Sequence, residues 1–435
     1  MPPARTGSCG DGPYHPAVRI PLPIDDALPG LLADLALRPC AVVVAPPGSG
    51  KTTRVPPALL ARGSGAVLVL QPRRVAARLA AARIAQERGV RLGDEVGYRT
   101  RFERRVGPHT RLEVLTEGLF LRRLQADPFL EGVSAVVLDE FHERSLDIDL
   151  ALALLREVQQ DARPDLALVV MSATLDPAPV AAFLGGPARC GVFEVAGRRF
   201  PVEHAFDPRP SRQWLAERVA AATRQELASQ QEPGHVLVFL PGVGEIEATR
   251  RALTSDPERP LPPDVTLLTL HGGLSARDQD AALAPDRRRK VVLATNIAET
   301  SITLDGVRSV VDAGLAKVPR FDLATGVERL ELQRIPRSSA DQRAGRAGRT
   351  GPGRCRRLWT EAEDRQLVAA WVPAVRRVDL APVWLQLAAW GADPRTFAWF
   401  EEPSPSALEA AATLLTRLGA TSDSGITPRG RALAT

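Results

Sequence analysis

The sequence predicts an α/β fold in which two domains with parallel sheets follow one another along the chain. Short β-branched runs alternate with Ala-, Leu- and Arg-rich helical stretches, this alternation begins again near mid-chain, and a glycine-containing loop follows the first run of valines. Strands separated by helices are typical of a parallel sheet with helices on both faces. The 435 residues, 44% of them hydrophobic, are enough for two or three domains that each bury a core.

The predicted strands are short, apolar and bounded by turn residues. In the first half they are Ala41–Val44, Ala66–Leu70, Leu112–Leu115, Ala135–Leu138 and Ala167–Met171, and in the second half His235–Leu240, Val265–Leu270, Lys290–Ala294 and Ser309–Val311. We place the linker near Gly197–Glu203, where a strand ends at Phe200 and Pro201. The expected domains are therefore 17–199 and 200–360, preceded by a Gly- and Pro-rich disordered tail at 1–16.

Two further segments differ from this alternation. Between about 317 and 333, apolar runs flank an Ala-Thr-Gly turn, which predicts a β-hairpin inserted in the second domain, either a wedge or a brace. After about Thr360 the pattern becomes helical, with amphipathic stretches at Val375–Trp390 and Ser406–Leu418 followed by GATSDSGITPRG. This order predicts a winged-helix-like region over 361–435.

Composition excludes several classes of protein. No apolar run approaches the roughly 18 residues that a membrane span needs, and the first residues lack the apolar region of a secretory signal. The four cysteines are far apart, so neither a zinc site nor a disulfide framework is indicated, and a reducing cytoplasm fits best. The 56 Lys and Arg residues exceed the 51 Asp and Glu residues by five, which is only weak support for a polyanion partner.

The segment APPGSGKTT at 45–53 fits the phosphate-binding P-loop pattern, with Ala45 where the commonest version has Gly. Gly48 and Gly50 let the backbone N–H groups face a β-phosphate, and Lys51 adds a point charge for the β and γ oxygens. Thr52 offers its hydroxyl to Mg²⁺. An apolar run precedes the loop and a helical pattern follows it, as the motif requires. The expected nucleotide-binding residues are Gly48, Ser49, Gly50, Lys51, Thr52 and Thr53.

A P-loop alone also fits a kinase, a transporter ATPase or a GTPase, and the segment LDEFHER at 138–144 discriminates among them. Asp139 follows an apolar strand at its carboxyl end, where open α/β sheets bind ligands. We expect Asp139 to hold Mg²⁺ and Glu140 to orient and deprotonate the attacking water. An acidic pair at a strand end is otherwise a helix N-cap. His142 is expected to face the opposite domain and exchange hydrogen bonds with a Gln or Ser there, the alternative being a structural histidine.

The segment QRAGRAGR contains Gln342, Arg346 and Arg349 at positions i, i+4 and i+7, which predicts that all three lie on one helical face. Gly345 and Gly348 would let that helix approach another surface closely. Two guanidinium groups so presented are suited to stabilising charge on a transferring γ-phosphate. A solvated basic helix is the alternative, but the interleaved glycines would then only destabilise it.

Taken together, the motif series resembles the DEAH/RHA group of superfamily 2 helicases, and most closely the bacterial HrpB type of ATP-dependent helicase. The resemblance covers roughly residues 20 to 435. Besides the segments above, it rests on an ordered set of motifs: QPRRVAA at 71–77, TEG at 116–118, SAT at 172–174, FLPG at 239–242, LHGGLS at 270–275 and ATNIAETSIT at 294–303.

The resemblance implies two tandem RecA-like P-loop domains with parallel sheets, followed by a partial winged helix. ATP, or other nucleoside triphosphates, and Mg²⁺ would bind between the domains, and a single nucleic-acid strand would cross them in a monomeric motor. The residues do not decide between RNA and DNA, and the resemblance favours RNA. Each site residue then has an implied role. Ser172 and Thr174 would couple hydrolysis to domain movement, Arg83 and Asp312 would approach the nucleotide base, and the nucleic-acid path would include Arg73, Arg74, Thr116, Thr295 and Asn296.

The sequence departs from the family pattern in two places. Leu283 stands where relatives often have a Phe that stacks on the base, and no adenine-reading Gln motif precedes the P-loop, so we expect weak discrimination among ATP, GTP, CTP and UTP. Relatives also continue past the winged helix into further domains, whereas this sequence stops at Thr435. A nucleic-acid-stimulated NTPase that remodels RNA or RNA–protein complexes without separating strands therefore stays open. A metabolic P-loop kinase is a third possibility, but it would have no use for the arginines of the second domain.

Overall fold

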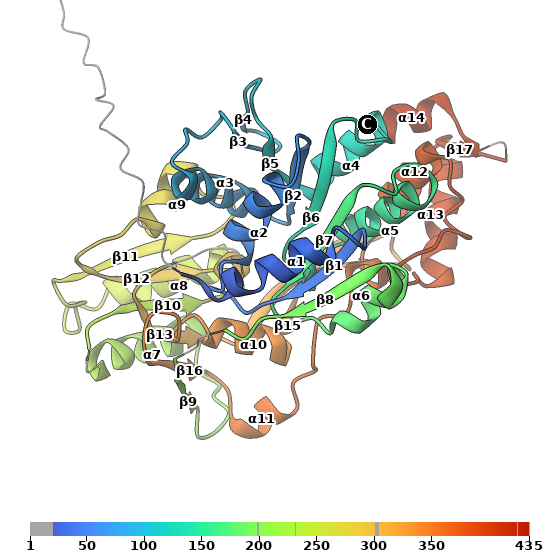
Figure 1. The fold of residues 1–435 in the computed structure, drawn as a ribbon. Helices are drawn as coiled ribbons and strands as arrows, with labels where there is room; N and C mark the ends of the chain where they lie inside the picture. The colour runs from blue at the N-terminus through green and yellow to red at the C-terminus, as the bar shows by residue number, and fades with distance from the viewer. Residues whose placement is uncertain (1–20, 198–199, 231, 301–303, 424, 435) are drawn as a thin grey trace, which may run out of the picture.

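The computed structural model describes residues 21–197, 200–230, 232–300, 304–423 and 425–434. Two α/β domains with mainly parallel sheets follow one another, as predicted, and a C-terminal helical region lies beside the first of them (Figure 1). The predicted tail at 1–16 lies outside the described residues. Within those residues, no helix is both long enough and apolar enough to span a bilayer.

The first sheet has eight strands in the order β4-β3-β5-β2-β6-β7-β1-β8, and all neighbours are parallel except β3 and β4. The strands are β1 (Cys40–Val44), β2 (Ala66–Gln71), β3 (Val96–Arg99), β4 (Arg104–Arg105), β5 (Leu112–Thr116), β6 (Val133–Leu138), β7 (Ala167–Ser172) and β8 (Cys190–Glu194). All five predicted strands are present. The sequence analysis missed β3, β4 and β8, which are short or interrupted by glycine and so lack a clear apolar run.

Helices cover both faces of this sheet because alternate residues of each strand point to opposite sides. Val43 packs under α1 (Leu28–Asp34), α2 (Lys51–Leu60) and α3 (Arg74–Arg88). Val42, one residue earlier, packs under α4 (Glu117–Ala126), α5 (Leu146–Asp161) and α6 (Pro177–Phe183). This sandwich holds the carboxyl ends of β1, β2, β6 and β7 at one edge, where the loops with the predicted site motifs begin.

The second sheet has six parallel strands in the order β11-β12-β10-β13-β16-β9. The strands are β9 (Val202–Phe206), β10 (His235–Phe239), β11 (Val265–Leu270), β12 (Arg289–Ala294), β13 (Val307–Asp312) and β16 (Gly353–Arg357), with helices α7 (Leu215–Ser229), α8 (Val243–Thr254), α9 (Ala276–Leu283), α10 (Arg337–Ala344) and α11 (Glu361–Arg365). The four predicted strands are present. Strand β16 was missed because its sequence, GRCRR, is polar, and β9 begins inside the predicted linker.

The predicted hairpin is present as β14 (Leu315–Asp322) and β15 (Val327–Arg334), an antiparallel pair outside the main sheet. Its turn ends at Gly326, whose φ of 68° is a left-handed conformation that glycine adopts without strain. The end of the hairpin near its turn is tied to the C-terminal region, because Arg377 Nη1 donates to the Pro319 carbonyl at 2.9 Å and Phe321 N donates to the Arg377 carbonyl at 2.7 Å. These bonds favour the brace over the wedge.

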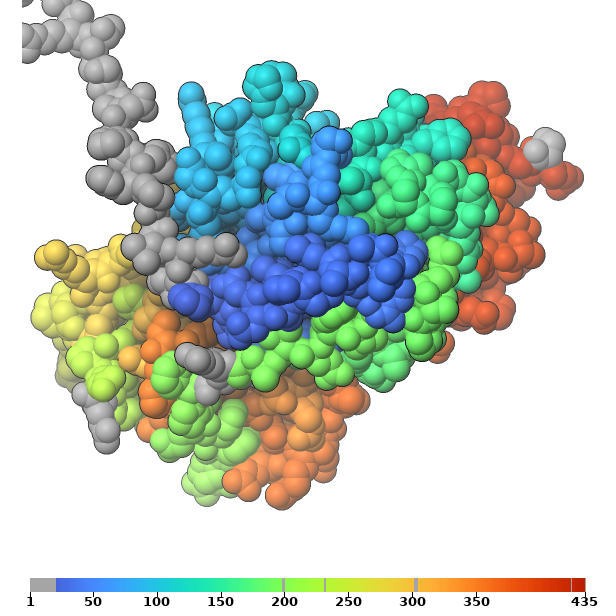
Figure 2. All heavy atoms as spheres, viewed as in Figure 1, coloured from blue at the N-terminus to red at the C-terminus, as the bar shows by residue number. Residues whose placement is uncertain are grey.

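The C-terminal region consists of α12 (Ala381–Trp390), α13 (Pro405–Arg417), the two-stranded wing β17 (Thr421–Ser422) and β18 (Gly425–Ile426), and α14 (Pro428–Ala434). The helix predicted from Val375 is wrong at its start: α12 begins at Ala381, whose N–H is bound by Asp379 Oδ1 at 2.9 Å. Trp384 joins the apolar core of the first domain, and Trp390 Nε1 donates to Glu157 at 3.1 Å. Figure 2 shows this region against the green and teal surface of the first domain.

Candidate functional site: a phosphate loop and an acidic pair between two domains

The P-loop connects β1 to α2 and is shaped by two glycines in left-handed conformations, Gly48 (φ 83°) and Gly50 (φ 91°). A Cβ atom on Gly50 would lie 2.6 Å from the Leu22 side chain, so only glycine fits. Ser49 is buried, its carbonyl accepts the Ile24 N–H at 3.1 Å, and its hydroxyl has no protein partner among the described residues. The loop therefore presents backbone N–H groups at the start of α2, where an anion is stabilised.

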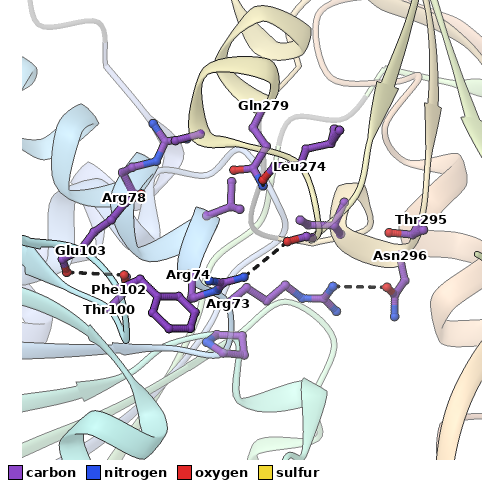
Figure 3. Close-up of a pocket in the computed structure, with 15 residues that line it drawn as sticks. Arg73, Arg74, Arg78, Thr100, Phe102, Glu103, Leu274, Gln279, Thr295 and Asn296 are labelled. Atoms are coloured by element: carbon purple, nitrogen blue, oxygen red, sulfur yellow. Dashed lines mark hydrogen bonds between the residues drawn. The ribbon is translucent and has the colours of Figure 1, made fainter. Parts of the chain in front are cut away.

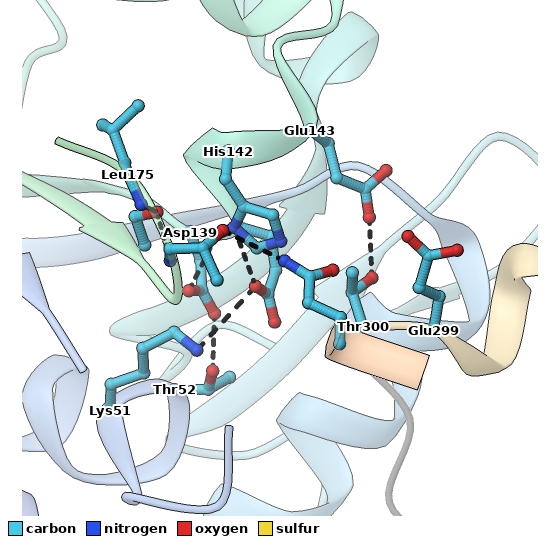
Figure 4. Close-up of polar contacts among 12 residues, drawn as sticks. Lys51, Thr52, Asp139, His142, Glu143, Leu175, Glu299 and Thr300 are labelled. Atoms are coloured by element: carbon cyan, nitrogen blue, oxygen red, sulfur yellow. Dashed lines mark hydrogen bonds and ion pairs between the residues drawn. The ribbon is translucent and has the colours of Figure 1, made fainter. Parts of the chain in front are cut away.

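Asp139 and Glu140 directly follow β6, and Figure 4 shows Asp139 near Lys51 and Thr52 of the P-loop. The Thr52 hydroxyl donates to Asp139 Oδ2 at 2.6 Å, and Gln71 Nε2 donates to the same oxygen at 2.6 Å. Lys51 Nζ lies 3.8 Å from Glu140 Oε2. Glu140 has φ 53°, a left-handed conformation that is uncommon for a residue with a side chain and is often found at functional sites. The predicted P-loop and acidic residues thus meet in one place.

The two carboxyl groups differ in their electrostatics. Burial, and then the neighbouring Glu140 charge, raises the pKa of Asp139 to about 6, against the opposing effect of Lys51. Burial also acts to raise the pKa of Glu140, but Lys51 and the more distant cations outweigh burial and hold that pKa below its usual value. Glu140 is therefore ionised at neutral pH, as a general base must be before it accepts a proton.

His142 follows the acidic pair on a single 3₁₀ turn, Phe141–Glu143. Its Nδ1 atom lies 3.6 Å from Glu140 Oε2, and neither ring nitrogen has a hydrogen-bond partner among the described residues. Burial lowers the pKa of the imidazole against the opposing charge of Glu140, so the ring is neutral. The expected exchange with a Gln of the second domain is not formed here: Gln342 Nε2 donates to Thr174 Oγ1 at 3.1 Å instead.

Ser172 ends β7, and Thr174 lies in the loop that follows, where it contacts Gln342 of the second domain. Ser172 Oγ accepts the N–H groups of Thr174 at 3.3 Å and Leu175 at 3.1 Å, and the Ser172 carbonyl accepts the Ala45 N–H at 2.9 Å. The Thr174 hydroxyl accepts a hydrogen bond from Gln342 of the second domain. A movement of the second domain would therefore be passed through Thr174 and Ser172 to Ala45, the first residue of the P-loop.

The arginine segment lies opposite the P-loop, but the prediction of one continuous helix through it is wrong. Helix α10 ends at Ala344 and the chain continues in turns, with the Ala347 N–H donating to the Ala344 carbonyl at 3.0 Å. Gly348 fits under the Phe200 carbonyl, where a Cβ atom would lie 2.7 Å away. Residues 345–349 therefore pack in turns against the segment near Phe200 and do not continue helix α10.

Gln342 and Arg349 nevertheless reach the phosphate loop. With Gly345 and Gly348 they line one side of a small pocket of about 80 Å³, whose other side is Pro47, Gly48 and Thr174. Arg346 is buried, donates from Nε to the Glu299 carbonyl at 3.0 Å and also binds the Thr300 carbonyl. Burial and the neighbouring Arg349 lower its pKa well below the ordinary value. After Lys51 and His142, the charges of both arginines also act to lower the pKa of Glu140.

A second pocket, of about 360 Å³, also lies between the two domains and collects most of the predicted nucleic-acid residues (Figure 3). Arg73 and Arg74 line it from the first domain, and Thr295 and Asn296 line it from the second. Arg73 Nη1 donates to Asn296 Oδ1 at 3.4 Å, which closes the pocket between the domains. Thr116 precedes α4 as its N-cap and is not among the residues that line this pocket.

Phe102 and Arg78 also line this pocket, although neither was predicted from the sequence as a site residue. Phe102 is 71% exposed, and the Arg74 guanidinium lies 5.1 Å from its ring centroid. Arg78 also lines the pocket and pairs with Asp280 of the second domain at 2.7 Å. Phe102 stands among arginines in the segment YRTRFERR at 98–105, and an aromatic ring between basic residues was the sequence signal for a nucleic-acid surface.

The two residues expected near the nucleotide base have partners of their own. Arg83 is on α3, is 58% exposed on its side chain and pairs with Glu87 at 2.7 Å. Its contact with a base stays a prediction. Asp312 is fully buried at the end of β13, where it accepts from Arg343 at 2.9 Å and from the Gly314 N–H at 2.9 Å. In this arrangement its carboxylate is directed into the second domain.

The geometry defines a class of site: a P-loop nucleotide site that is shared by two RecA-like domains. Comparison with known families agrees with this class. Residues 27–183 match the model of the DEAD/DEAH box helicase domain, and residues 218–351 match the helicase conserved C-terminal domain. The two α/β domains of this chain are therefore those of a DEAD/DEAH box helicase.

Individual relatives support the same grouping. The chain is 45% identical to the ATP-dependent RNA helicase HrpB of Escherichia coli over 95% of its own length and 51% of the relative, and 38% identical to the human probable ATP-dependent RNA helicase DHX34 over 96% and 37%. Two crystal structures of E. coli HrpB match with TM-scores of 0.88 and 0.83, covering 95% and 96% of this chain and 52% and 51% of theirs. The chain thus spans about half the length of HrpB.

Proposed function

We propose that this chain is an ATP-driven nucleic-acid translocase of the DEAH type that acts on single-stranded RNA. One observation carries the proposal: residues of both domains build two sites in the same cleft. The P-loop faces Gln342 and Arg349 across one pocket, and Arg73 faces Asn296 across the other. Nucleotide binding and strand binding would then both favour closure of the cleft, which couples them.

The residues at the P-loop fit Mg²⁺ bound together with a nucleoside triphosphate. The Thr52 hydroxyl and the Asp139 carboxylate are hard oxygen ligands 2.6 Å apart, and the buried Ser49 hydroxyl has no protein partner among the described residues. Thr52 and Asp139 would hold the ion, with Gln71 fixing the carboxylate. When bound, Mg²⁺ neutralises charge on the β and γ phosphates.

The protein's own groups account for the remaining chemistry. Lys51 and the N-terminus of α2 bind the phosphates, and Glu140 accepts the proton of the attacking water. Arg349, from the second domain, contributes positive charge at the γ-phosphate when the cleft is closed, and Arg346 lies beside it. Because this charge belongs to another domain, hydrolysis depends on closure. Such an arginine accelerates phosphoryl transfer by about 10³-fold or more.

The second pocket supports a nucleic-acid strand as the other ligand. Guanidinium and amide groups at Arg73, Arg74 and Asn296 suit phosphate oxygens, which carry no sequence information and therefore suit a motor that moves along any sequence. The exposed Phe102 ring offers a surface on which a base can stack. RNA is proposed over DNA because HrpB and DHX34 are described as RNA helicases. We propose that the motor is monomeric, since one chain supplies both sides of the site. We also propose a cytoplasmic location, which fits the widely spaced cysteines.

A nucleic-acid-stimulated NTPase without strand separation is the second candidate, favoured by the description of one HrpB structure as a DExH-box NTPase. A strand-displacement assay on a tailed RNA duplex, run beside an ATPase assay, separates the two. We expect ATP-dependent displacement that is lost in Glu140→Gln. Phosphate release without displacement would support the NTPase, whereas phosphate transfer to a small molecule would contradict both.

A further inference from the structure

The last acidic residue of the DEFHER segment, Glu143, is not needed for the nucleotide chemistry described above. It ends the 3₁₀ turn that begins at Phe141, and its carboxylate is directed towards the second domain (Figure 4). Arg73 binds it with two atoms, Nε at 3.2 Å and Nη2 at 3.1 Å. The hydroxyl of Thr300, on the second domain, donates to Glu143 Oε1 at 2.7 Å. One carboxylate therefore bridges the domains.

Each partner of Glu143 belongs to a different site. Arg73 lines the nucleic-acid pocket and reaches Asn296 on its far side at 3.4 Å. Thr300 provides the backbone carbonyl that binds Arg346, one of the two arginines whose charge acts on Glu140. Hydrogen bonds thus run without interruption from the strand pocket through Glu143 to the arginine beside the general base.

The ion pair between Glu143 and Arg73 is partly buried and has two hydrogen bonds, which strengthens this path. The Glu143 side chain is 18% exposed and that of Arg73 is 24% exposed, so the pair is partly shielded from solvent. Charge-assisted, two-point contacts of this kind are stronger and more directional than neutral hydrogen bonds. A strand phosphate that binds Arg73 would shift the guanidinium group away from Glu143 or reorient it. The Glu143 carboxylate would then move, and with it the Thr300 hydroxyl that it binds.

We infer that Glu143 is a positioning residue that couples occupation of the nucleic-acid pocket to the placement of Arg346 beside the nucleotide site. The inference rests on the proposed function and adds a route by which RNA stimulates hydrolysis. Removing Glu143 should change the stimulation by RNA without changing basal ATP turnover, whereas loss of a purely structural residue would lower both. Basal turnover persists, because the P-loop, Asp139 and Glu140 are intact, whereas the acceleration by RNA is lost.

The test is Glu143→Gln in the full chain, with steady-state ATPase measured without nucleic acid and with saturating poly(U) RNA. We expect basal kcat within about twofold of wild type and a stimulation factor roughly tenfold lower, within the usual range of coupling between two sites. Thr300→Val removes the other half of the bridge and should give the same phenotype. The double variant should be no worse than either single variant, because both changes break one path.

Glu113→Gln is the matched control, since Glu113 is another partly buried glutamate bound by two arginines, Arg99 at 2.8 Å and Arg123 at 3.0 Å, all within the first domain. It should keep full stimulation. If Glu143→Gln and Thr300→Val are both stimulated by RNA as strongly as wild type, the inference is wrong but the proposed function stands. The same holds if Thr300→Val lowers the basal and the stimulated rates equally. A wild-type chain that no RNA stimulates overturns the proposed function, and the inference with it.

Discussion

Arg144, the residue that ends the DEFHER segment, connects the nucleotide site to the C-terminal region. Its guanidinium binds Asp149 of α5, with Nε–Oδ1 at 2.8 Å and Nη2–Oδ2 at 2.9 Å, and lies 3.3 Å from Glu401. It also stacks 4.5 Å from the centroid of the Phe400 ring. The Asp149 side chain is 4% exposed, so its charge depends on this one arginine.

Replacing Arg144 with Met keeps much of the apolar volume but leaves Asp149 as an unpaired buried charge. Removing one partner of a buried ion pair typically destabilises a protein by about 3–5 kcal/mol. Because the Arg144 side chain is 16% exposed, we expect the lower end, about 3 kcal/mol. Urea denaturation at pH 7 measures this change in the free energy of unfolding, and Arg144→Met, Asp149→Asn should recover much of it.

The pH dependence adds an independent check. Burial raises the pKa of Asp149 while Arg144 lowers it, so the variant has a higher Asp149 pKa than wild type. A carboxyl group whose folded-state pKa is raised costs stability as the pH rises from its unfolded pKa through its folded one. The loss of unfolding free energy in Arg144→Met should therefore become smaller as the pH falls from 7 to 5. A loss below about 1 kcal/mol, or an equal loss at both pH values, refutes the reasoning.

Three further predictions address the nucleotide site and its surroundings. Arg346→Ala, Arg349→Ala should abolish ATP turnover but spare ATP binding by equilibrium titration, and intact turnover would remove both arginines from the mechanism. With Leu283 partly buried against the second-domain core, kcat/KM for GTP and CTP should stay within about a hundredfold of ATP. Burial raises the Glu117 pKa to about 8, so unfolding free energy should fall from pH 5 to pH 8 in wild type but not in Glu117→Gln; equal urea profiles would contradict this.

The parts of the site that depend on local chemistry were predictable from the sequence. Lys51 and Thr52 follow from the P-loop spacing, and Asp139 and Glu140 follow from a polar pair directly after an apolar strand. The same holds for the strands that are continuous apolar runs. In each case the pattern and the position in space are determined by a few neighbouring residues.

What the sequence did not predict depends on packing between distant segments. Helix α10 stops at Ala344 because the following turns fit under the chain near Phe200, a contact that no helical periodicity reveals. His142 lacks its expected partner because Gln342 binds Thr174. Glu143 reads as one more acidic residue in a motif, and only the fold brings Arg73 and Thr300 to it from opposite domains.

The central claim, that strand binding and ATP hydrolysis share one cleft, is tested most directly by ATPase stimulation with single-stranded RNA and DNA of matched sequence over a series of salt concentrations. The account predicts stimulation by RNA, with a half-saturating RNA concentration that rises steeply with salt because arginines contact phosphates. Turnover that no nucleic acid changes at any salt concentration would contradict it.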